Sequence, residues 1–289
     1  MKQKLLFIAN PVLKKNNIHE IKGSIDKTIN KDKFDHDFIV TARKGEGEEI
    51  TVKNKDNYQA IIAVGGDGTV NEIARGLVKS NKALGIIPTG SGNGLARTLK
   101  IPINIIEAIK IINNFRTKKI DCGIINGHFF FNISGVGFDA EIAGLFNQTK
   151  SRGFFNYFQL TAKYFFRYKP KFYQININGK TLNKEAFLIA LANSTQFGNN
   201  AHINPKGLLD DGKIECCLLK KFPLMSALPL AIRMFSKTLH QSGYFEYYQA
   251  EEIKISAQEN MKGHIDGDVV LFGKELNVRI VKEGLQVIY

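Results

Sequence analysis

The stretch AIIAVGGDGTVNE, residues 60–72, decides the fold of this chain. Its first five residues are apolar, which is typical of a strand buried on both faces. A glycine-rich turn at 65–68 follows at once, and apolar residues then recur at helical spacing from Val70 to Leu77. A strand that leads through such a turn into a helix is the repeating unit of a parallel α/β sheet.

The same alternation extends on both sides of this stretch. Apolar runs predict strands at 5–9, 38–40 and 84–87, and the intervening patterns predict helices at 17–30 and 45–54. In sheets of this kind, ligands bind beyond the carboxyl ends of the strands. The glycine- and asparagine-rich turns of this half are therefore candidate binding loops.

The pattern changes after about residue 118. Asn178-Gly179 is a hairpin signal, and several segments alternate between apolar and polar residues. We predict helices at 153–167 and 224–239, and strands at 128–134, 172–178, 185–192, 213–219, 251–256, 262–266 and 275–281. The chain is thus predicted to have an α/β domain at 1–118 and a β-rich domain at 119–289, whose last residues can return to the first domain.

Composition limits the classes of function. The chain has 289 residues and a net charge of +13, which favours nucleic acid, phosphates or an acidic membrane as partner, although charge for solubility explains it equally well. Its three cysteines lack the spacing of a zinc site and indicate a reducing compartment. No apolar run is long enough for a signal peptide or a membrane span, so we expect a cytoplasmic protein.

The glycine-rich turn is a candidate phosphate site. Glycine lets the backbone approach a ligand, and the helix that follows presents free N–H groups and a positive dipole end. Asp67 beside phosphate calls for a cation or a hydroxyl, and Thr69 is expected to cap the helix. A second glycine-rich turn, PTGSGNGLAR at 88–97, also opens a helix. The structural alternative for the first turn is an ordinary strand-to-helix connection. For the second turn it is a helix cap at Ser91.

Two acidic strings mark the distal half. NPKGLLDDGK at 204–213 carries adjacent carboxylates, which suit a hard divalent cation, although an ordinary Asp-Gly turn is favoured on the residues alone. HIDGD at 264–268 carries two acids around a glycine. Paired acids can split their pKa values so that one becomes a general base, whereas the structural alternative is a hairpin turn.

GGDGTVNE and PTGSGNGLAR resemble signatures of the diacylglycerol kinase catalytic domain, which belongs with NAD kinases and phosphofructokinases. Further strings, DCG at 121–123, FNISGVGFDA at 131–140 and the two acidic ones, are similar to the same family, and the Gly-Ser-Gly-Asn form resembles the sphingosine kinase branch. The resemblance covers nearly the whole chain. It implies a Rossmann-like nucleotide-binding domain, an antiparallel β-sandwich domain and a lipid kinase activity that uses ATP and Mg²⁺.

The resemblance also implies site residues. For ATP they are Asn10, Thr41, Gly65, Gly66, Asp67, Gly68, Thr69, Asn71, Glu72 and Ser91. For Mg²⁺ they are Asp211 and the backbone of Leu208 and Lys213; for catalysis Asp67, Asp266 and Asp268; and for the lipid headgroup Asp139. From their charge, Arg97, Lys14 and Lys15 are expected to attract phosphate or anionic lipid headgroups.

The chain departs from the family pattern at two places. Asp268 replaces a glutamate, and the turn after the first strand, NPVLKKN at 10–16, lacks a glycine. In the second glycine-rich turn, Ser91 stands at the family's threonine position and Gly94 at its aspartate position. A shorter acid at 268 puts its role as base in doubt. Fewer glycines mean fewer close contacts between backbone and phosphate, for which lysine charge can compensate.

We therefore expect an enzyme that binds ATP between its two domains and phosphorylates the primary hydroxyl of a lipid alcohol, such as diacylglycerol or a long-chain base. It would meet anionic phospholipid headgroups at a membrane surface, without a nucleic-acid partner and with a homodimer as an option. A kinase of a soluble nucleotide or sugar, or a non-catalytic lipid or nucleotide sensor, are the alternatives.

Overall fold

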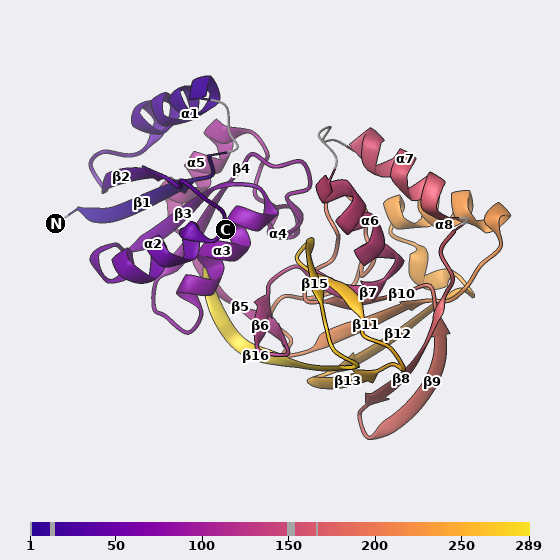
Figure 1. Ribbon diagram of the computed structural model, residues 1–289. Helices are drawn as coiled ribbons and strands as arrows, with labels where there is room; N and C mark the ends of the chain where they lie inside the picture. The colour runs from indigo at the N-terminus through magenta and orange to yellow at the C-terminus, as the bar shows by residue number, and fades with distance from the viewer. Residues whose placement is uncertain (1, 12–14, 149–153, 166) are drawn as a thin grey trace. The chain divides into compact units, whose positions relative to one another are not determined.

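The computed structural model describes residues 2–11, 15–148, 154–165 and 167–289 (Figure 1). The chain divides into two compact units, which are residues 1–120 with 283–289, and residues 121–282. Strand β5 (Thr117–Ile125) leads from unit 1 into unit 2, and β16 (Glu275–Ile288) leads back. The boundary predicted after residue 118 falls within β5.

Unit 1 alternates strands and helices along the chain. Its remaining elements are β1 (Gln3–Ala9), α1 (Lys15–Thr28), β2 (Phe34–Val40), α2 (Glu46–Asn54), the 3₁₀ helix η1 (Lys55–Asn57), β3 (Ala60–Gly65), α3 (Asp67–Leu77), β4 (Ala83–Pro88), α4 (Gly94–Thr98) and α5 (Ile105–Asn114).

The sheet of unit 1 has the strand order β2-β1-β3-β4, and the end of β16 pairs with β4. All of these pairings are parallel. Residues 5–9 of β1 and 60–64 of β3 are fully buried, because helices α1 and α5 cover one face and α2 and α3 the other (Figure 1). The predicted α/β domain with a parallel sheet is confirmed.

Parallel pairing places the ends of these strands at one edge. Ala9, the last residue of β1, pairs with Val64, and Gly65, the last residue of β3, pairs with Pro88. The loops after β1, β3 and β4 therefore emerge side by side at the carboxyl edge of the sheet, where α/β proteins bind their ligands.

Unit 2 is rich in antiparallel strands. Its elements are β6 (His128–Phe130), β7 (Ile133–Gly137), α6 (Phe138–Gln148), α7 (Phe154–Phe165), β8 (Lys171–Ile177), β9 (Lys180–Ala186), β10 (Leu188–Ala192), β11 (Ile214–Leu219), the 3₁₀ helix η2 (Leu224–Ser226), α8 (Ala227–Phe235), the 3₁₀ helix η3 (Leu239–Gln241), β12 (Phe245–Ala250), β13 (Glu252–Ser256), β14 (Lys262–Ile265) and β15 (Asp268–Leu271).

These strands form a sandwich. One layer has the order β12-β11-β10-β7-β14-β15, and the other has β16-β13-β8-β9. Apolar side chains from both layers share one buried cluster, which includes Cys216 of β11 and Ile255 of β13. The adjacent Cys217 belongs to a second cluster with Leu230 of α8, so the sheet is covered on both faces. The predicted antiparallel β-sandwich is confirmed.

The strands on either side of the predicted hairpin differ from expectation at one point. Asn178 and Gly179 have φ of 51° and 74° and join β8 to β9, as their sequence signals. The single strand predicted at 185–192 is wrong, because the chain passes at Phe187 from β9 in one layer to β10 in the other. Alternation of apolar residues does not show where a chain changes sheets. Within the described residues, no helix is both long and apolar enough to cross a membrane.

Candidate functional site

The glycine-rich turn between β3 and α3 is shaped by the space around its backbone. A Cβ at Gly65 would lie 2.4 Å from Thr69 Oγ1, and one at Gly66 would lie 3.0 Å from the Cα of Gly90. A Cβ at Gly68, in contrast, would meet nothing within 4 Å. Among the residues that the structure describes, no side chain caps the start of α3. The first turn of this helix is thus open on the side of Gly68, as a phosphate site at a helix N-terminus requires.

Asp67 joins this turn to the loop after β4. Its Oδ1 accepts a hydrogen bond from Gly94 N at 2.7 Å, and its Oδ2 accepts one from Asn93 N at 2.9 Å. The two loops also touch through their backbones, since a Cβ at Gly90 would lie 2.4 Å from the Cα of Gly66. The two glycine-rich loops therefore form one structure with a shared carboxylate.

Asn93 holds the second loop and was not singled out from the sequence. Its backbone is left-handed, with φ of 53°. Its Oδ1 accepts from Gly90 N at 3.0 Å, and its Nδ2 donates to Gly90 O at 2.7 Å. An asparagine between two glycines could have signalled this role, because asparagine tolerates positive φ and bonds to nearby backbone.

The environment of Asp67 acts on its charge in two directions. Burial raises the pKa of the Asp67 carboxyl group, while the N–H donors of Gly94 and Asn93 and the charge of Arg97 lower it. Burial is the largest of these effects. A carboxylate that is both desolvated and tied to two backbone amides is suited to a fixed position beside a cation or a hydroxyl.

Asn10 and Thr41 follow β1 and β2 at the same edge. Asn10 Nδ2 donates to Thr69 Oγ1 at 3.2 Å, which connects the loop after β1 to the start of α3. Thr41 bonds through its backbone N, at 2.9 Å, and its hydroxyl to the carbonyl oxygen of Ala9. The expectation that Thr69 caps α3 is wrong, because the helix begins at Asp67 with Gly66 in the N-cap position.

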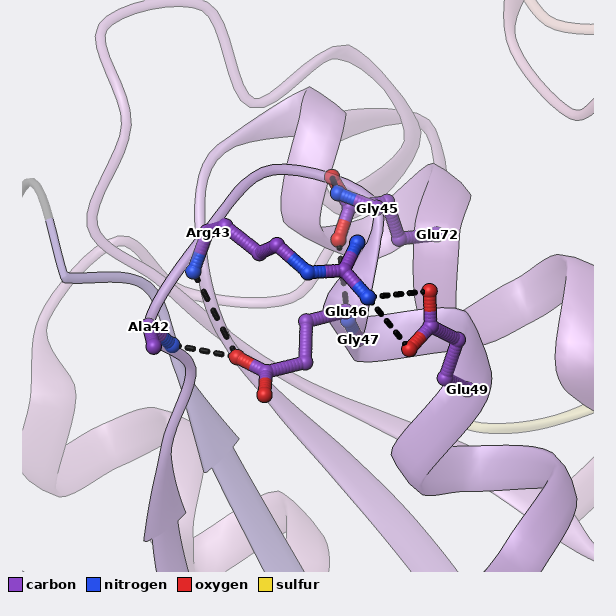
Figure 2. Close-up of polar contacts among 7 residues, drawn as sticks. All are labelled: Ala42, Arg43, Gly45, Glu46, Gly47, Glu49 and Glu72. Atoms are coloured by element: carbon purple, nitrogen blue, oxygen red, sulfur yellow. Dashed lines mark hydrogen bonds and ion pairs between the residues drawn. The ribbon is translucent and has the colours of Figure 1, made fainter.

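Glu72 lies on α3 and holds the loop after β2. Its carboxylate accepts hydrogen bonds from Gly45 N at 2.8 Å and Gly47 N at 3.1 Å (Figure 2). The neighbouring Asn71 and Glu72 are both buried. In this structure Glu72 acts on the protein backbone, so its assignment to ATP is untested and its visible role is to position residues 42–47.

The same loop is fastened by its own charged side chains (Figure 2). Glu46 accepts from the backbone N of Ala42 and, at 3.4 Å, from that of Arg43. Arg43 Nη2 lies 2.7 and 2.6 Å from the two carboxylate oxygens of Glu49. No sequence motif predicted this arrangement, which adds the loop after β2 to the three others at the carboxyl edge of the sheet.

The residues predicted to attract phosphate or lipid headgroups are placed differently from one another. Arg97 Nε donates to Gly92 O at 3.1 Å and so supports the second loop, whose Ser91 is exposed. Lys15 is the first residue of α1. Lys14 lies outside the described residues.

In unit 2, Asp266 and Gly267 form the two-residue turn between β14 and β15. Both have positive φ, of 48° and 91°, as the turn of a tight hairpin requires. The two oxygens of Asp266 accept from Phe131 N and Asn132 N, each at 2.9 Å. Asp268 begins β15 and is partly exposed. The backbone at 264–268 is therefore the hairpin turn that was the structural alternative. The side chain of Asp266 holds the two residues that precede β7.

Asp139, at the start of α6, pairs with a histidine that was quoted in a motif but given no role. His264 Nε2 lies 3.1 Å from Asp139 Oδ2, and both side chains are buried. Gly267 N donates to His264 Nδ1 at 3.3 Å. The pair thus supports the turn that carries Asp266 and brings Asp139, His264 and the acidic hairpin into one cluster of unit 2.

A second acidic cluster of unit 2 surrounds Asp211. Asp211 Oδ1 accepts from Lys213 N at 3.1 Å, and the buried Asp121 accepts from Gly212 N at 2.7 Å. Glu215, on β11, is fully buried, and its Oε1 accepts from Gln249 at 3.2 Å. Glu215 was missed from the sequence because it occupies an interior strand position that usually carries an apolar residue.

The oxygen-rich surroundings of Asp211 fit a hard cation. Buried oxygens of Glu215 and Asn204 have no hydrogen-bond partner among the described groups. Those groups include no cluster of three or more His, Cys, Asp or Glu side chains that could hold a metal. A cation here would thus depend on backbone carbonyls, such as those of Leu208 and Lys213, as Mg²⁺ and Ca²⁺ sites often do.

Glu215 predicts a pH dependence of stability. Burial, with a further contribution from the charge of Asp211, raises the pKa of Glu215 from 4.5 to about 7. Between these values the folded protein keeps a proton that the unfolded chain has lost, so the free energy of unfolding falls as pH rises through this window. We expect Glu215→Gln to remove most of that fall, which is at most about 3 kcal/mol.

The measurement is denaturant unfolding of both proteins at pH 5 and pH 8, with EDTA to exclude metal. Glu259→Gln, which alters an exposed acid of the same unit, is the control and should follow the parent. Equal pH dependence in Glu215→Gln and the parent would contradict the assigned environment of Glu215.

Comparison with known proteins agrees with this geometry. Residues 4–125 match the family described as the diacylglycerol kinase catalytic domain, and residues 132–289 match the YegS C-terminal NAD kinase beta sandwich-like domain. The first match contains both glycine-rich loops of unit 1. The second contains the acidic hairpin and, except for Asp121, the cluster around Asp211 in unit 2.

Individual relatives point the same way. The chain is 31% identical over 218 residues to a diacylglycerol kinase of Bacillus subtilis, covering 73% of this chain and 71% of that one. A diacylglycerol kinase structure from Bacillus anthracis has a TM-score of 0.78 at 23% identity and covers 99% and 97% of the two chains. Yeast NADH kinase shares the fold more distantly, with a TM-score of 0.55 at 13% identity. The match covers 100% of this chain and 84% of the yeast chain. The chain therefore belongs to the diacylglycerol kinase family of lipid kinases.

Proposed function

We propose that this protein transfers the γ-phosphoryl group of ATP to the primary hydroxyl of a lipid alcohol, with diacylglycerol as the first candidate and a long-chain base as the second. The observation that carries the proposal is the joining of the two glycine-rich loops by Asp67 beside the open first turn of α3. That arrangement suits a polyphosphate, which needs close backbone approach and free amides.

The residues of unit 1 fit the nucleotide end of this reaction. ATP, when bound, supplies the phosphoryl group, and Mg²⁺ neutralises its charge. The start of α3 would hold phosphate oxygens near Gly68, where a side chain is absent and space is open. Asp67, fixed by Gly94 and Asn93, would organise the metal end of the nucleotide. In phosphoryl transfer such positioning and charge neutralisation supply most of the catalysis.

The residues of unit 2 fit the acceptor end. Asp266 is committed to the amides of Phe131 and Asn132, so it is suited to positioning rather than to proton transfer. Asp268 is partly exposed at the start of β15 and would take the proton of the lipid hydroxyl. The buried pair of Asp139 and His264 would fix the hairpin that carries it.

The decisive experiment is turnover of radiolabelled ATP with Mg²⁺ and a panel of lipid alcohols in mixed micelles. We expect labelled product from diacylglycerol, a long-chain base or another lipid alcohol, and none when Mg²⁺ is removed with EDTA. Diacylglycerol is tested first because relatives of this chain carry the name diacylglycerol kinase. The Mg²⁺ ion is part of the proposal because the Asp211 cluster and the nucleotide both offer oxygen ligands to a hard cation.

The same panel separates the alternatives. Turnover of a sugar or nucleoside without micelles would establish a soluble-substrate kinase instead. ATP or lipid binding without any turnover would establish a sensor, a result that the departures at Asp268 and in the turn at 10–16 make worth testing. Either result would overturn the proposed function.

A further inference from the structure

An apolar face is exposed on the outside of unit 2. It consists of five side chains of η2 and α8, namely Leu224, Met225, Leu228, Ile232 and Phe235, and is called the α8 face below. Met225 is 90% exposed, Leu228 67% and Ile232 58%. Large apolar residues that gather on one surface mark an interaction site rather than ordinary scatter.

The sequence explains why the helix presents this face. Residues 224, 228, 232 and 235 recur at helical spacing and so lie along one side. The opposite side carries Leu230, which is buried, and Met234, which packs against the same apolar cluster. His202 N donates to Met234 O at 3.1 Å and ties the end of the helix to the body of the unit. The α8 face is thus turned outward because the helix buries its other side.

The ends of α8 carry residues that are typical of helix termini. Pro229 lies in the first turn of α8, where its missing N–H costs no helical hydrogen bond. The helix ends at Phe235, and Lys237 two residues later has a left-handed φ of 62°. The helix, and with it the apolar stripe, therefore ends at Phe235.

The charged residues nearest to the α8 face in the sequence are basic. From Cys216 to Phe245 the sequence contains no aspartate or glutamate, but it contains Lys220, Lys221, Arg233 and Lys237. Lys220 lies 2.8 Å from Glu246, while Lys221 and Lys237 are exposed. An apolar strip rimmed by lysine and arginine is complementary to a bilayer interface that contains anionic phospholipid.

From these observations we infer that the α8 face docks unit 2 on an anionic membrane surface, with its aliphatic side chains inserted at the level of the headgroups and Lys221 and Lys237 against lipid phosphates. A second copy of the chain fits less well, because two basic rims would face each other and the chain already carries a net charge of +13. The inference rests on the proposed function only in that a lipid kinase must meet its substrate in a membrane.

The test is co-sedimentation with vesicles of phosphatidylcholine alone or with about one third phosphatidylglycerol, without nucleotide or lipid substrate. The parent should bind the anionic vesicles, and more weakly at high salt, because exposed charges are screened over about 10 Å at 0.1 M. The variant Leu228→Asp/Ile232→Asp should bind at least ~10-fold more weakly, since it places two charges where apolar chains should insert.

Matched variants make the result specific. Phe172→Asp alters a side chain of the same unit that is 70% exposed and lies on β8, and it should bind like the parent. Met225→Asp repeats the test at the most exposed position of the face. Circular dichroism and thermal unfolding check that each variant folds.

Each outcome has a defined meaning. Parent-like vesicle binding by both α8-face variants would overturn the inference, and so would equal loss in Phe172→Asp. The parent could instead fail to bind vesicles and form a dimer that the variant Leu228→Asp/Ile232→Asp dissociates. That result would assign the α8 face to a second copy of the chain. Because vesicle binding is measured without turnover, its result tests the α8 face independently of the kinase assay.

Discussion

Asp67→Asn is expected to lower turnover by at least ~10²-fold, because misplacement of a positioning group by about 1 Å can cost that much. The amide keeps the size of the side chain but loses the negative charge proposed to organise the metal end of ATP. Turnover at saturating Mg²⁺ and binding of a fluorescent ATP analogue measure the two consequences.

The structure adds a loss of stability to this prediction. Both oxygens of Asp67 accept backbone N–H groups, from Gly94 and Asn93, whereas an amide offers only one acceptor. We therefore expect the free energy of unfolding to fall by about 1–3 kcal/mol, the usual cost of leaving a buried donor without its acceptor.

The control is Asp56→Asn, which removes the same charge from an exposed residue of unit 1. It should leave both turnover and stability near those of the parent. Full activity in Asp67→Asn would refute the proposed role of Asp67. Lost stability with normal nucleotide binding and turnover would leave it a purely structural link between the loops.

Asp268→Asn is expected to reduce kcat by on the order of 10²–10⁴-fold, the usual contribution of a general base. Its stability should change little, because Asp268 is partly exposed. Asp268→Glu restores the acid found in the family and should preserve or raise kcat. The initial rate of lipid phosphorylation, measured across pH, shows whether the loss belongs to a titrating group.

Asp266→Asn provides the comparison within the same turn. Asparagine accepts the left-handed backbone of this position, but its amide can serve only one of the N–H groups of Phe131 and Asn132. We expect a stability loss of about 1–3 kcal/mol together with reduced kcat. Asp210→Asn, at an exposed position, controls for the change in charge.

The pair of variants decides between the roles. If Asp268→Asn keeps full turnover while Asp266→Asn is folded and inactive, Asp266 is the base and the scheme above is wrong. If both keep full turnover, the base must be sought near Asp67.

Much of the fold could be predicted because its signals are local. The buried strands of unit 1 are uninterrupted apolar runs, and the turn at 178–179 is specified by two adjacent residues. The break at Phe187 could not be predicted, since β9 and β10 belong to different layers and their separation depends on partners distant in sequence. The helix α6 (Phe138–Gln148) was missed for a related reason, because its start was interpreted only as a motif.

The candidate site divides in the same way. Its motifs named Asp67, Asp266 and Asp211 without any structure, but not the atoms that these carboxylates contact. Asn93, His264 and Glu215 emerged only when the chain was folded, because each acts through a neighbour that is close in space. A residue type at a given spacing indicates available chemistry, whereas its partners determine whether that chemistry is directed at a ligand or at the protein.

The amino-acid sequence by itself determined the two-domain α/β and β-sandwich architecture, because that depends on local patterns, and its motifs were enough to indicate the lipid kinase family and to name candidate acids. Only the tertiary structure decided that Asp67 ties two loops together, that Asp266 holds backbone amides and that the α8 face is exposed. The physical reason is that hydrogen bonding and burial depend on distances between residues far apart in the chain, which periodicity does not encode.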